Sequence, residues 1–331
     1  MMTIYEIAKL AHVSTSTVSR VINKKPGIKQ TTRERVEKIL NEYHFHLNET
    51  ARSLSTKSSK MIGIIVADIR NTHYTELAYE TEIYLKENGY CSIINNAGNT
   101  PQKMEEALLL LSQRQVDGLI IIGSIFENKV VKNCLSHIFS QIPIIFLNGY
   151  FDNTNSYSIL ANEEQGVFDC ASLLYSKAYT HIAFFSVMHT SSNTNKLNGY
   201  KRAIKHKQPK ELLLDLDENK IRNFENDALI EFFATNKTID GIICSDDYLA
   251  AYVMRYLQSI GINIPNDIGI IGIDNSNICP LVSPPLTSLD TKMAEMGQLG
   301  SQELINLLKN KPVSKKMMIF PEIKIRESIR S

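Results

Sequence analysis

From residue 61 onward the chain alternates between short apolar runs and amphipathic segments of helical length, and this alternation restricts its fold more than any other feature. The first run, residues 61–67 (MIGIIVA), is apolar throughout, as in strands buried on both faces of a parallel sheet. Residues 74–88 then show helical periodicity and stop at Gly89. Because parallel strands are joined by crossover connections, usually helices, the pattern predicts an α/β fold with parallel sheets flanked by helices.

The same alternation continues toward the end of the chain and is enough for two α/β sheets. Helix starts are predicted at Pro101 after Thr100 and after the Ser245-Asp246-Asp247 stretch, because a capping side chain precedes each helical pattern. Further strands are expected at residues 91–95, 119–122, 144–147, 182–185, 212–214, 242–244 and 268–272.

Length and composition bound the class of protein. The 331 residues imply two or three domains, and 43% apolar residues provide material for packed cores. No apolar stretch approaches the roughly 20 residues that span a bilayer, and the first residues lack a basic segment followed by an apolar run. We therefore expect a cytoplasmic protein without a membrane span. The five cysteines are spread out, without CxxC pairs, which predicts reduced, mostly buried thiols and no zinc site.

The net charge of +1 hides an asymmetry between the two ends of the chain. Residues 1–60 hold 11 Lys and Arg against 5 Asp and Glu, and the remainder holds 25 against 30. A compact basic piece is typical of a module that neutralises phosphates of a nucleic acid, although a solvated basic surface gives the same count.

The first sixty residues predict a helix-turn-helix. Apolar residues recur at helical spacing between Ile4 and Ala11, and a second helix starts at Ser14 or Thr15. This second helix places Val18, Val21 and Ile22 on one face and leaves hydroxyl side chains and Arg20 on the other. Such a face suits a helix in the major groove, where hydroxyls reach phosphates or bases and arginine binds guanine. The alternative is an ordinary helical hairpin with a polar exterior.

After the Pro26-Gly27 turn, Thr31 or Thr32 with Glu34 resembles a helix N-cap, and a third helix is expected to close the core. A three-helix bundle is therefore predicted. A short helix-capable segment at residues 48–55 and a polar tether at residues 56–60 follow, as in a hinge and linker.

These segments closely resemble the headpiece of the LacI/GalR family of bacterial transcription factors. The resemblance rests on Thr3 to Ala8, Val13-Ser14, Thr17 to Asn23, Thr32 to Val36 and Asn48-x-x-Ala51-Arg52-x-Leu54. It implies that Thr15, Ser16 and Arg20 read bases. It also implies that further residues contact DNA or orient the helix: Thr3, Ile4, Tyr5, Ser14, Thr17, Ser19, Asn23 and Thr32.

In that family the segment matching Asn48, Ala51 and Leu54 folds as a hinge helix on DNA, and the leucine wedges into the minor groove. Wedging an apolar side chain between base steps kinks the duplex. Leu54 as a plain helix residue packed on its own body is the alternative. Phe45 and Leu47 stand where the family usually has Tyr and Pro, so the hinge start departs from the pattern.

Polar residues follow several of the predicted strands. Asp68 and Asn71 come after the first, residues 245–247 after another, and Asp274 and Asn275 after the last. Open α/β sheets bind ligands at the carboxyl ends of their strands, so these residues predict a small-molecule site. Carboxylates and amides suit hydroxyl-rich ligands such as sugars, while for any one Asp a helix cap or surface loop is the alternative.

The resemblance continues through residues 85–90, 116–120, 162–166, 199–200, 261–267, 272–275 and 285–289. It implies a two-lobed core of the periplasmic sugar-binding type, whose cleft would be lined by Asn71, Tyr74, Lys196, Asp246 and Asp274, with Asp68 added from the strand-end argument. Four places depart from the family pattern: Thr72-His73-Tyr74 replaces Pro-Phe-Phe, Lys196 replaces Arg, Asp246 replaces Asn or Ser, and Ala161 replaces Asp. The effector is therefore not copied from a relative.

The expected organisation is a headpiece at 1–47, a hinge and linker at 48–60 and a core at 61–331. The first lobe of the core would hold about residues 61–160 and 290–318, and the second about 161–289 and 319–331. The resemblance implies a homodimer that binds a palindromic operator in double-stranded DNA and responds to a small, sugar-like effector. No cofactor, metal or enzymatic activity is expected. The alternatives are a sugar receptor without DNA function and a regulator controlled by a protein corepressor.

Overall fold

The computed structural model describes residues 2–22, 24–43, 58–152, 154–187, 189–208 and 210–331, and it forms two compact units, Met1–Ser59 and Lys60–Ser331. The expected hinge residues Asn48, Ala51 and Leu54 lie outside the described residues, as do Phe45 and Leu47. Asn23 of the expected DNA-binding set also lies outside them.

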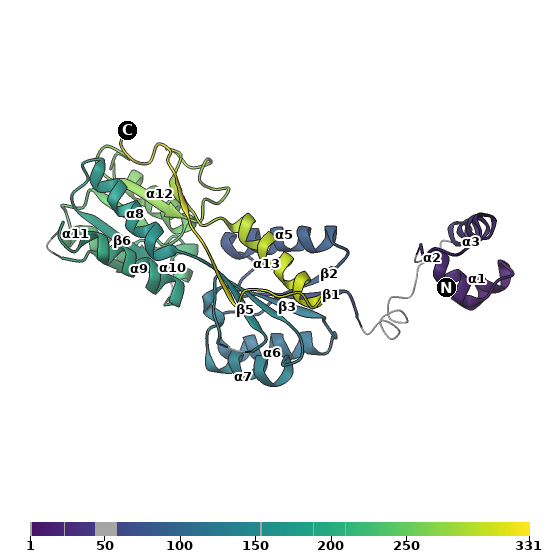
Figure 1. Ribbon diagram of the computed structural model, residues 1–331. Coiled ribbons are helices and arrows are strands. Elements are labelled where there is room, and N and C mark those ends of the chain that lie inside the picture. The colour runs from purple at the N-terminus through teal and green to yellow at the C-terminus, as the bar shows by residue number, and fades with distance from the viewer. Residues whose placement is uncertain (1, 23, 44–57, 153, 188, 209) are drawn as a thin grey trace. The chain divides into compact units, whose positions relative to one another are not determined.

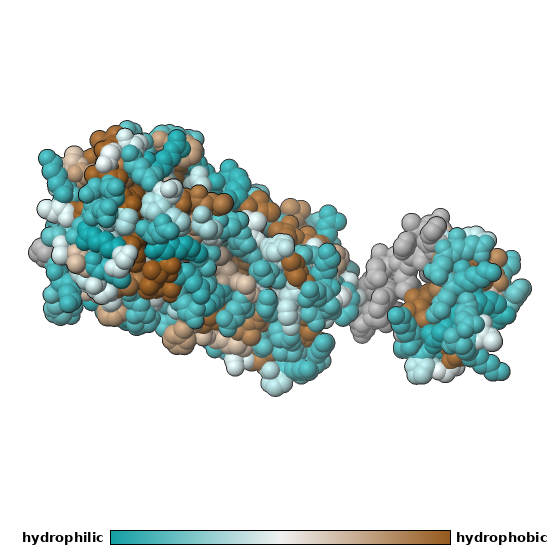
Figure 2. Space-filling view, turned by 90° about the horizontal axis from the view of Figure 1, so that it is seen from above, coloured by the Kyte–Doolittle hydropathy of each residue, from teal (hydrophilic) through white to brown (hydrophobic). Residues whose placement is uncertain are grey.

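The first unit is built from three helices, α1 (Ile4–Leu10), α2 (Thr15–Ile22) and α3 (Gln30–Glu42), which confirms the predicted bundle (Figure 1). Its core consists of the apolar positions that recur at helical spacing: Ile7, Ala8, Ala11, Val18, Val21 and Val36. The turn between α1 and α2 has His12 in the left-handed region, with φ 50°. On the face seen in Figure 2 the surface of this unit is mostly hydrophilic.

The predicted cap of α3 is wrong. The helix begins at Gln30 with Lys29 as its N-cap residue, and no side chain caps it. Thr32 already lies in the first turn, where its N–H donates to the Lys29 carbonyl. Glu34 accepts a hydrogen bond from Gln30 Nε2 at 2.9 Å, so the carboxylate that suggested a capping pair is used one turn along the helix surface.

The first lobe of the second unit contains a six-stranded sheet in the order β11-β5-β4-β3-β1-β2. All its strands run parallel, with β1 beside both β2 and β3. Helices α5 (Thr72–Glu87) and α13 (Met293–Leu308) cover one face, and α6 (Pro101–Ser112) and α7 (Lys129–Ile138) cover the other (Figure 1). The strands are β1 (Met61–Val66), β2 (Cys91–Asn96), β3 (Gly118–Ile122), β4 (Ile144–Leu147), β5 (Ser156–Ala161) and β11 (Lys316–Ile319).

The second lobe has a six-stranded sheet in the order β12-β10-β9-β8-β6-β7, parallel except for β12. Its faces are buried separately: Ile242 and Ile270 pack with α11 (Asp227–Thr235) and α12 (Asp247–Ser259), whereas Ile243 and Ile271 pack with α8 (Glu163–Ser176) and α9 (Ser191–Ile204). The strands are β6 (Ile182–Ser186), β7 (Leu213–Asp215), β8 (Gly241–Cys244), β9 (Gly269–Ile273), β10 (Thr287–Asp290) and β12 (Glu322–Lys324), and α10 (Glu218–Arg222) is a short helix of this lobe. The short helix η1 (Ser124–Phe126) follows β3 in the first lobe.

The chain passes between the two lobes three times. It leaves the first sheet after β5, leaves the second after β10, and returns from β11 to β12 within a few residues. The strands expected from apolar runs are confirmed to within two residues, and Thr100 caps α6 as predicted. Helix α12 begins at Asp247 with Asp246 as its cap, one residue earlier than predicted. Four strands were not predicted from the sequence, and they lie at or next to these crossings: β5, β10, β11 and β12.

Among the described residues, no helix has both the length and the apolar character needed to cross a bilayer. Four cysteines are buried, as expected, and the fifth, Cys91, is exposed.

Candidate functional site

The exposed face of α2 carries most of the side chains expected to meet DNA. Ser16 and Arg20 are exposed, while Thr15, Thr17 and Ser19 are partly exposed beside the buried Val18. Ser14 Oγ accepts the Thr17 N–H at 3.2 Å and lies 2.9 Å from Thr17 Oγ1 and 2.7 Å from Ser16 Oγ. These hydroxyls therefore form a connected cluster at the start of the helix, where backbone N–H groups favour phosphate.

Residues of α1 divide between this surface and the fold itself. Tyr5 is 75% exposed and available to a ligand, whereas Ile4 packs against the core of the unit. Thr3 forms a capping box: its Oγ1 accepts the Glu6 N–H, while its own N–H donates to Glu6 Oε2 at 2.6 Å. The Thr-x-x-Glu spacing is a known signature of this cap, and the sequence reading overlooked it.

A polar pocket in the second unit lies between the two lobes. Five of the six expected effector residues line it, and the sixth, Asp68, does not: the five are Asn71, Tyr74, Lys196, Asp246 and Asp274. The remaining lining residues are His73, Gly123, Ser124, Asn148, Val187, Thr190, Ser192, Asn193 and Ser245. The pocket thus gathers hydroxyl, amide and carboxylate groups that follow strands of both sheets, as the strand-end rule predicts, together with Ser192, Asn193 and the ammonium group of Lys196 from α9.

His73 was not predicted as a site residue, yet it makes the charge contact that crosses the pocket. Asn71 caps α5 by accepting the His73 N–H at 3.0 Å, which turns this first helical turn toward the second lobe. His73 Nδ1 lies 3.2 Å from Asp274 Oδ1, close enough for an ion pair but without the alignment of a hydrogen bond. Burial lowers the pKa of His73, but the Asp274 carboxylate outweighs it and the pKa stays raised.

Asp274 is held in an unusual backbone conformation. Its φ is 106° and that of Asn275 is 51°, both in the region that favours glycine. Thr291 Oγ1 donates to Asp274 Oδ1 at 3.1 Å. Burial alone would raise the pKa of Asp274, yet His73, Lys196 and Thr291 lower it to about 2. The carboxylate is therefore ionised at neutral pH and directed into the pocket.

The buried Asp247 supports the loop that carries Asp274. Its carboxylate accepts the Ser276 N–H at 2.7 Å and the Ser288 hydroxyl at 2.6 Å. A side chain at Gly272 would overlap Asp247, so glycine makes room for this contact. Burial raises the pKa of Asp247 to about 7.

Lys196 lies on α9 with its side chain buried, and its ammonium group contacts other groups of the protein. Its Nζ donates to the Ser245 carbonyl at 2.9 Å and lies 3.6 Å from Glu163 Oε1. Burial opposes its charge, but Glu163 and the neighbouring carboxylates raise the pKa of Lys196 overall. The position of α9 depends on Gly199, because a Cβ there would overlap the Glu164 carbonyl oxygen of α8.

Glu163 also ties the two lobes together. Its Oε1 accepts from Asn148 Nδ2 of the first lobe at 3.0 Å and from Ser192 Oγ at 2.7 Å. The Ser192 N–H donates to Ser124 Oγ, again across the lobes, at 3.3 Å. Glu163 belongs to a segment that resembles the family, but its role was not predicted, because a helix-start glutamate normally faces solvent.

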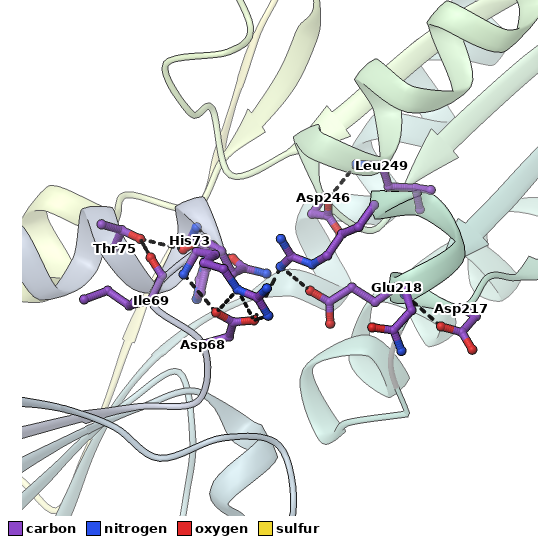
Figure 3. A network of polar contacts seen from close by, with 12 residues as sticks. Asp68, Ile69, His73, Thr75, Asp217, Glu218, Asp246 and Leu249 are labelled. Carbon is purple, nitrogen blue, oxygen red and sulfur yellow. Dashed lines mark hydrogen bonds and ion pairs between the residues drawn. The ribbon is translucent and has the colours of Figure 1, made fainter. Parts of the chain in front are cut away.

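Asp68 lies outside the pocket lining, in an ion-pair network at the edge of the cleft (Figure 3). Arg70 Nη2 donates to Asp68 Oδ2 at 2.7 Å. Arg222, at the end of α10 in the second lobe, places its Nη2 3.6 Å from Asp68 Oδ2 and 2.6 Å from Glu218 Oε1. The hydrogen bond from Arg70 is the main reason that the pKa of Asp68 is lowered. The structure therefore assigns this carboxylate to a contact between the lobes.

Comparison with known families matches both units. Residues 3–48 match the model described as bacterial regulatory proteins, lacI family, and residues 171–329 match the periplasmic binding protein-like domain. The chain belongs to the lacI family. It is thus a DNA-binding transcriptional regulator, with a helix-turn-helix headpiece and a two-lobed core, as its sequence resemblance implied.

Two full-length relatives illustrate the similarity of this lacI family member. An HTH-type transcriptional regulator of Lachnoclostridium phytofermentans is 29% identical, over 99% of both chains. The HTH-type transcriptional repressor PurR of Vibrio atlanticus is also 29% identical, over 100% of this chain and 99% of the relative.

The fold is shared with the lac repressor. A crystal structure of the lac repressor dimer bound to operator and the anti-inducer ONPF superposes with a TM-score of 0.86 at 20% identity, over 100% of this chain and 99% of that chain. This likeness establishes the arrangement of helices and sheets.

Proposed function

We propose that this lacI family member is a repressor that binds an operator of twofold symmetry as a homodimer, and that a small hydroxyl-rich effector in the interlobe cleft changes its affinity for DNA. The observation that carries the proposal is the set of polar contacts that cross the cleft: His73 to Asp274, Asn148 to Glu163 and Ser192 to Ser124. A ligand that replaces these contacts changes the relation of the lobes and so biases a two-state equilibrium.

The DNA-binding roles follow the exposed face of α2. We assign base reading to Thr15, Ser16 and Arg20, and contact with the DNA backbone to Tyr5, Ser14, Thr17, Ser19, Asn23 and Thr32. Thr3 and Ile4 act at the edge of this surface through the position of α1. The segment with Asn48, Ala51 and Leu54 acts as the hinge, with Leu54 in the minor groove. The protein works in the cytoplasm, where its DNA is.

The corresponding organisation is a headpiece at residues 1–47, a hinge at 48–60 and an effector core at 61–331, with effector contacts from Asn71, Tyr74, Lys196, Asp246 and Asp274. Relatives named as repressors over their full length support this assignment. Asp68 is left out of the effector set because Arg70 occupies its carboxylate.

Selection of binding sites from random duplexes tests the DNA-binding part. The full chain should enrich a site with twofold symmetry, and Arg20→Ala should relax base preference at one position of each half-site, at a cost of about 1 to 3 kcal/mol. Lys38→Ala on the exposed side of α3 serves as a control for a lost positive charge. Sites without symmetry, or an unchanged preference in Arg20→Ala, would contradict the assignment.

A thermal-shift screen tests the effector part, since a ligand that binds the folded state raises the melting temperature by mass action. A hit should then change the affinity for the selected operator. A hit that leaves operator affinity unchanged would separate ligand binding from regulation and reject the proposed control.

A further inference from the structure

We propose that the cleft selects effectors without negative charge, and that the Asp246 carboxylate receives a hydrogen-bond donor from the ligand, either a hydroxyl or an amino group. This inference rests on the proposed function, because it names the chemical class of the effector. It follows from a balance of the charges that line the pocket.

Both cationic side chains at the pocket, Lys196 and His73, already pair with groups of the protein. Lys196 Nζ is 3.6 Å from Glu163 Oε1 and donates to the Ser245 carbonyl, and His73 Nδ1 is 3.2 Å from Asp274 Oδ1. Each cation therefore already has its own carboxylate. An anionic ligand would find no positive charge left over at this end of the cleft.

Asp246 is the carboxylate at the pocket that neither of these two cations pairs with. Asp246 lines the interlobe pocket and is partly exposed to it. Its Oδ1 accepts the Leu249 N–H at 2.7 Å as the cap of α12, while its Oδ2 has a long contact of 3.5 Å from Ser245 Oγ. Within the described parts of the chain, no ion pair with a cationic side chain is found for Asp246. Burial raises the pKa of Asp246, and Asp274 adds to the rise, while the hydrogen bond from Leu249 and the more distant charge of Lys196 oppose it.

The arginines at the edge of the cleft could otherwise attract an anion. Arg70 and Arg222 line a second hollow that shares Asn71, Val187 and Asp246 with the pocket. Their charges are matched by Asp68, which binds Arg70 through two nitrogens, and by Glu218, which lies 2.6 Å from Arg222. This network is neutral as a whole, so it does not offset the negative charge of Asp246.

With Asp246 ionised, the net charge of Asp246, Asp274, Glu163, Lys196 and His73 is negative whether or not His73 is protonated. A sugar acid or phosphate ester would place another negative charge beside Asp246 in a partly buried pocket, which is unfavourable. A neutral polyol supplies a hydroxyl to Oδ2 at no such cost, and an ammonium group neutralises the carboxylate.

The test uses ligands that share a sugar ring and differ in one substituent and its charge: glucose, glucosamine, glucuronate and the phosphate monoester of glucose, with the same four forms of galactose, plus ribose and its phosphate. Affinities are measured by calorimetry on the full chain. We expect the neutral or amino form of a binding sugar to bind about a hundredfold more tightly than its anionic form. Tighter binding of an anionic form overturns the inference while the proposed function stands.

The variant Asp246→Asn retains a side chain that can cap α12 and removes the charge. It should reduce the difference in affinity between the neutral and the anionic form of a sugar by about tenfold, and it should weaken binding of the amino form more than binding of the neutral form. An unchanged gap overturns the inference. If no member of the panel binds, the result counts against the proposed sugar-like effector itself and the inference falls with it.

A second measurement needs no ligand. Because Asp246 has no ion pair with a cationic side chain among the described residues, Asp246→Asn should leave the melting temperature unchanged or raise it at neutral pH. Asp68→Asn, the matched control at a carboxylate with two arginine partners, should lower it. A loss of stability in Asp246→Asn similar to that in Asp68→Asn would show a cationic partner within the protein and overturn the proposal.

Discussion

His73 of the first lobe and Asp274 of the second lie 3.2 Å apart, Nδ1 to Oδ1, and both side chains are largely buried. Their pKa values move in opposite directions from the usual ones, upward for His73 and down to about 2 for Asp274. Each group thus stabilises the charged form of the other across the cleft. The pair makes lobe closure sensitive to protons.

The contribution of His73 to stability should be present below its ordinary pKa of about 6.5 and be lost as pH rises through its raised value in the folded protein. We expect His73→Gln to remove that part of the pH dependence and to cost about 3 kcal/mol at pH 6, because Asp274 loses its cation. Chemical denaturation between pH 5 and 9 measures both.

Asp247 also changes the stability of the protein over this pH range, so its contribution must be distinguished from that of His73. Its pKa is raised to about 7, so the stability that this group contributes is lost as the pH rises from its ordinary pKa near 4 to about 7. Because Asp247 is present in both proteins, the difference between wild type and His73→Gln isolates His73. Parallel profiles for the two proteins would contradict the assignment.

Lys196→Met should destabilise the core by about 3 kcal/mol, since it leaves the buried Glu163 without its cation. The double variant Lys196→Met with Glu163→Gln should recover most of that loss. Lys201→Met is a matched control on the same helix, because Lys201 pairs with Glu211 at the surface and should change stability by less than about 0.5 kcal/mol. Additive losses in the double variant would refute the pairing.

Gly199→Ala should lower stability by at least about 1 to 3 kcal/mol, because the new methyl group overlaps the Glu164 carbonyl and separates α8 from α9. It should also disturb Lys196, one turn earlier on α9. Gly241→Ala is the control, because its nearest neighbour is the Ile182 side chain at 3.3 Å and a side chain shifts more easily than backbone. Equal effects of the two substitutions would argue against close helix packing.

Cys91 should react with a thiol reagent such as DTNB in the native protein, while Cys134, Cys170, Cys244 and Cys279 should react after unfolding. Burial raises the pKa of these four thiols, to about 12 for Cys279, so their reactive thiolate form is scarce. Cys91→Ser should abolish the fast phase. More than one fast thiol per chain would show that the core opens readily.

The sequence predicted the strands that are buried on both faces, because such strands are continuous apolar runs like β1 and β3. It did not predict β10, where the buried residues Thr287 and Ser288 are polar: the Thr287 N–H donates to Ser328 Oγ and the Ser288 hydroxyl to Asp247 Oδ1. Periodicity reports burial against apolar neighbours, so strands that use polar partners escape it.

The same limit applies to the cleft. The rule that ligands bind at strand ends brought Asn71, Asp246 and Asp274 together, since it depends on topology alone. It could not separate Asp68, because the partner Arg222 is 154 positions away along the chain. His73 was visible only as a departure from a family pattern, and its partner became apparent with the lobes in place.

The three passages between the lobes have a consequence for synthesis of the protein. Helix α13 and strand β11 complete the first lobe, yet the ribosome produces them only after strands β6 to β10 of the second lobe. Until then β5 is paired with β4 but lacks β11 on its other side, and one face of the first sheet lacks the side chains of Met296, Leu304 and Ile305. Between the synthesis of β5 and that of β11, the nascent chain therefore presents an open strand edge and an apolar surface, a state that chaperones recognise.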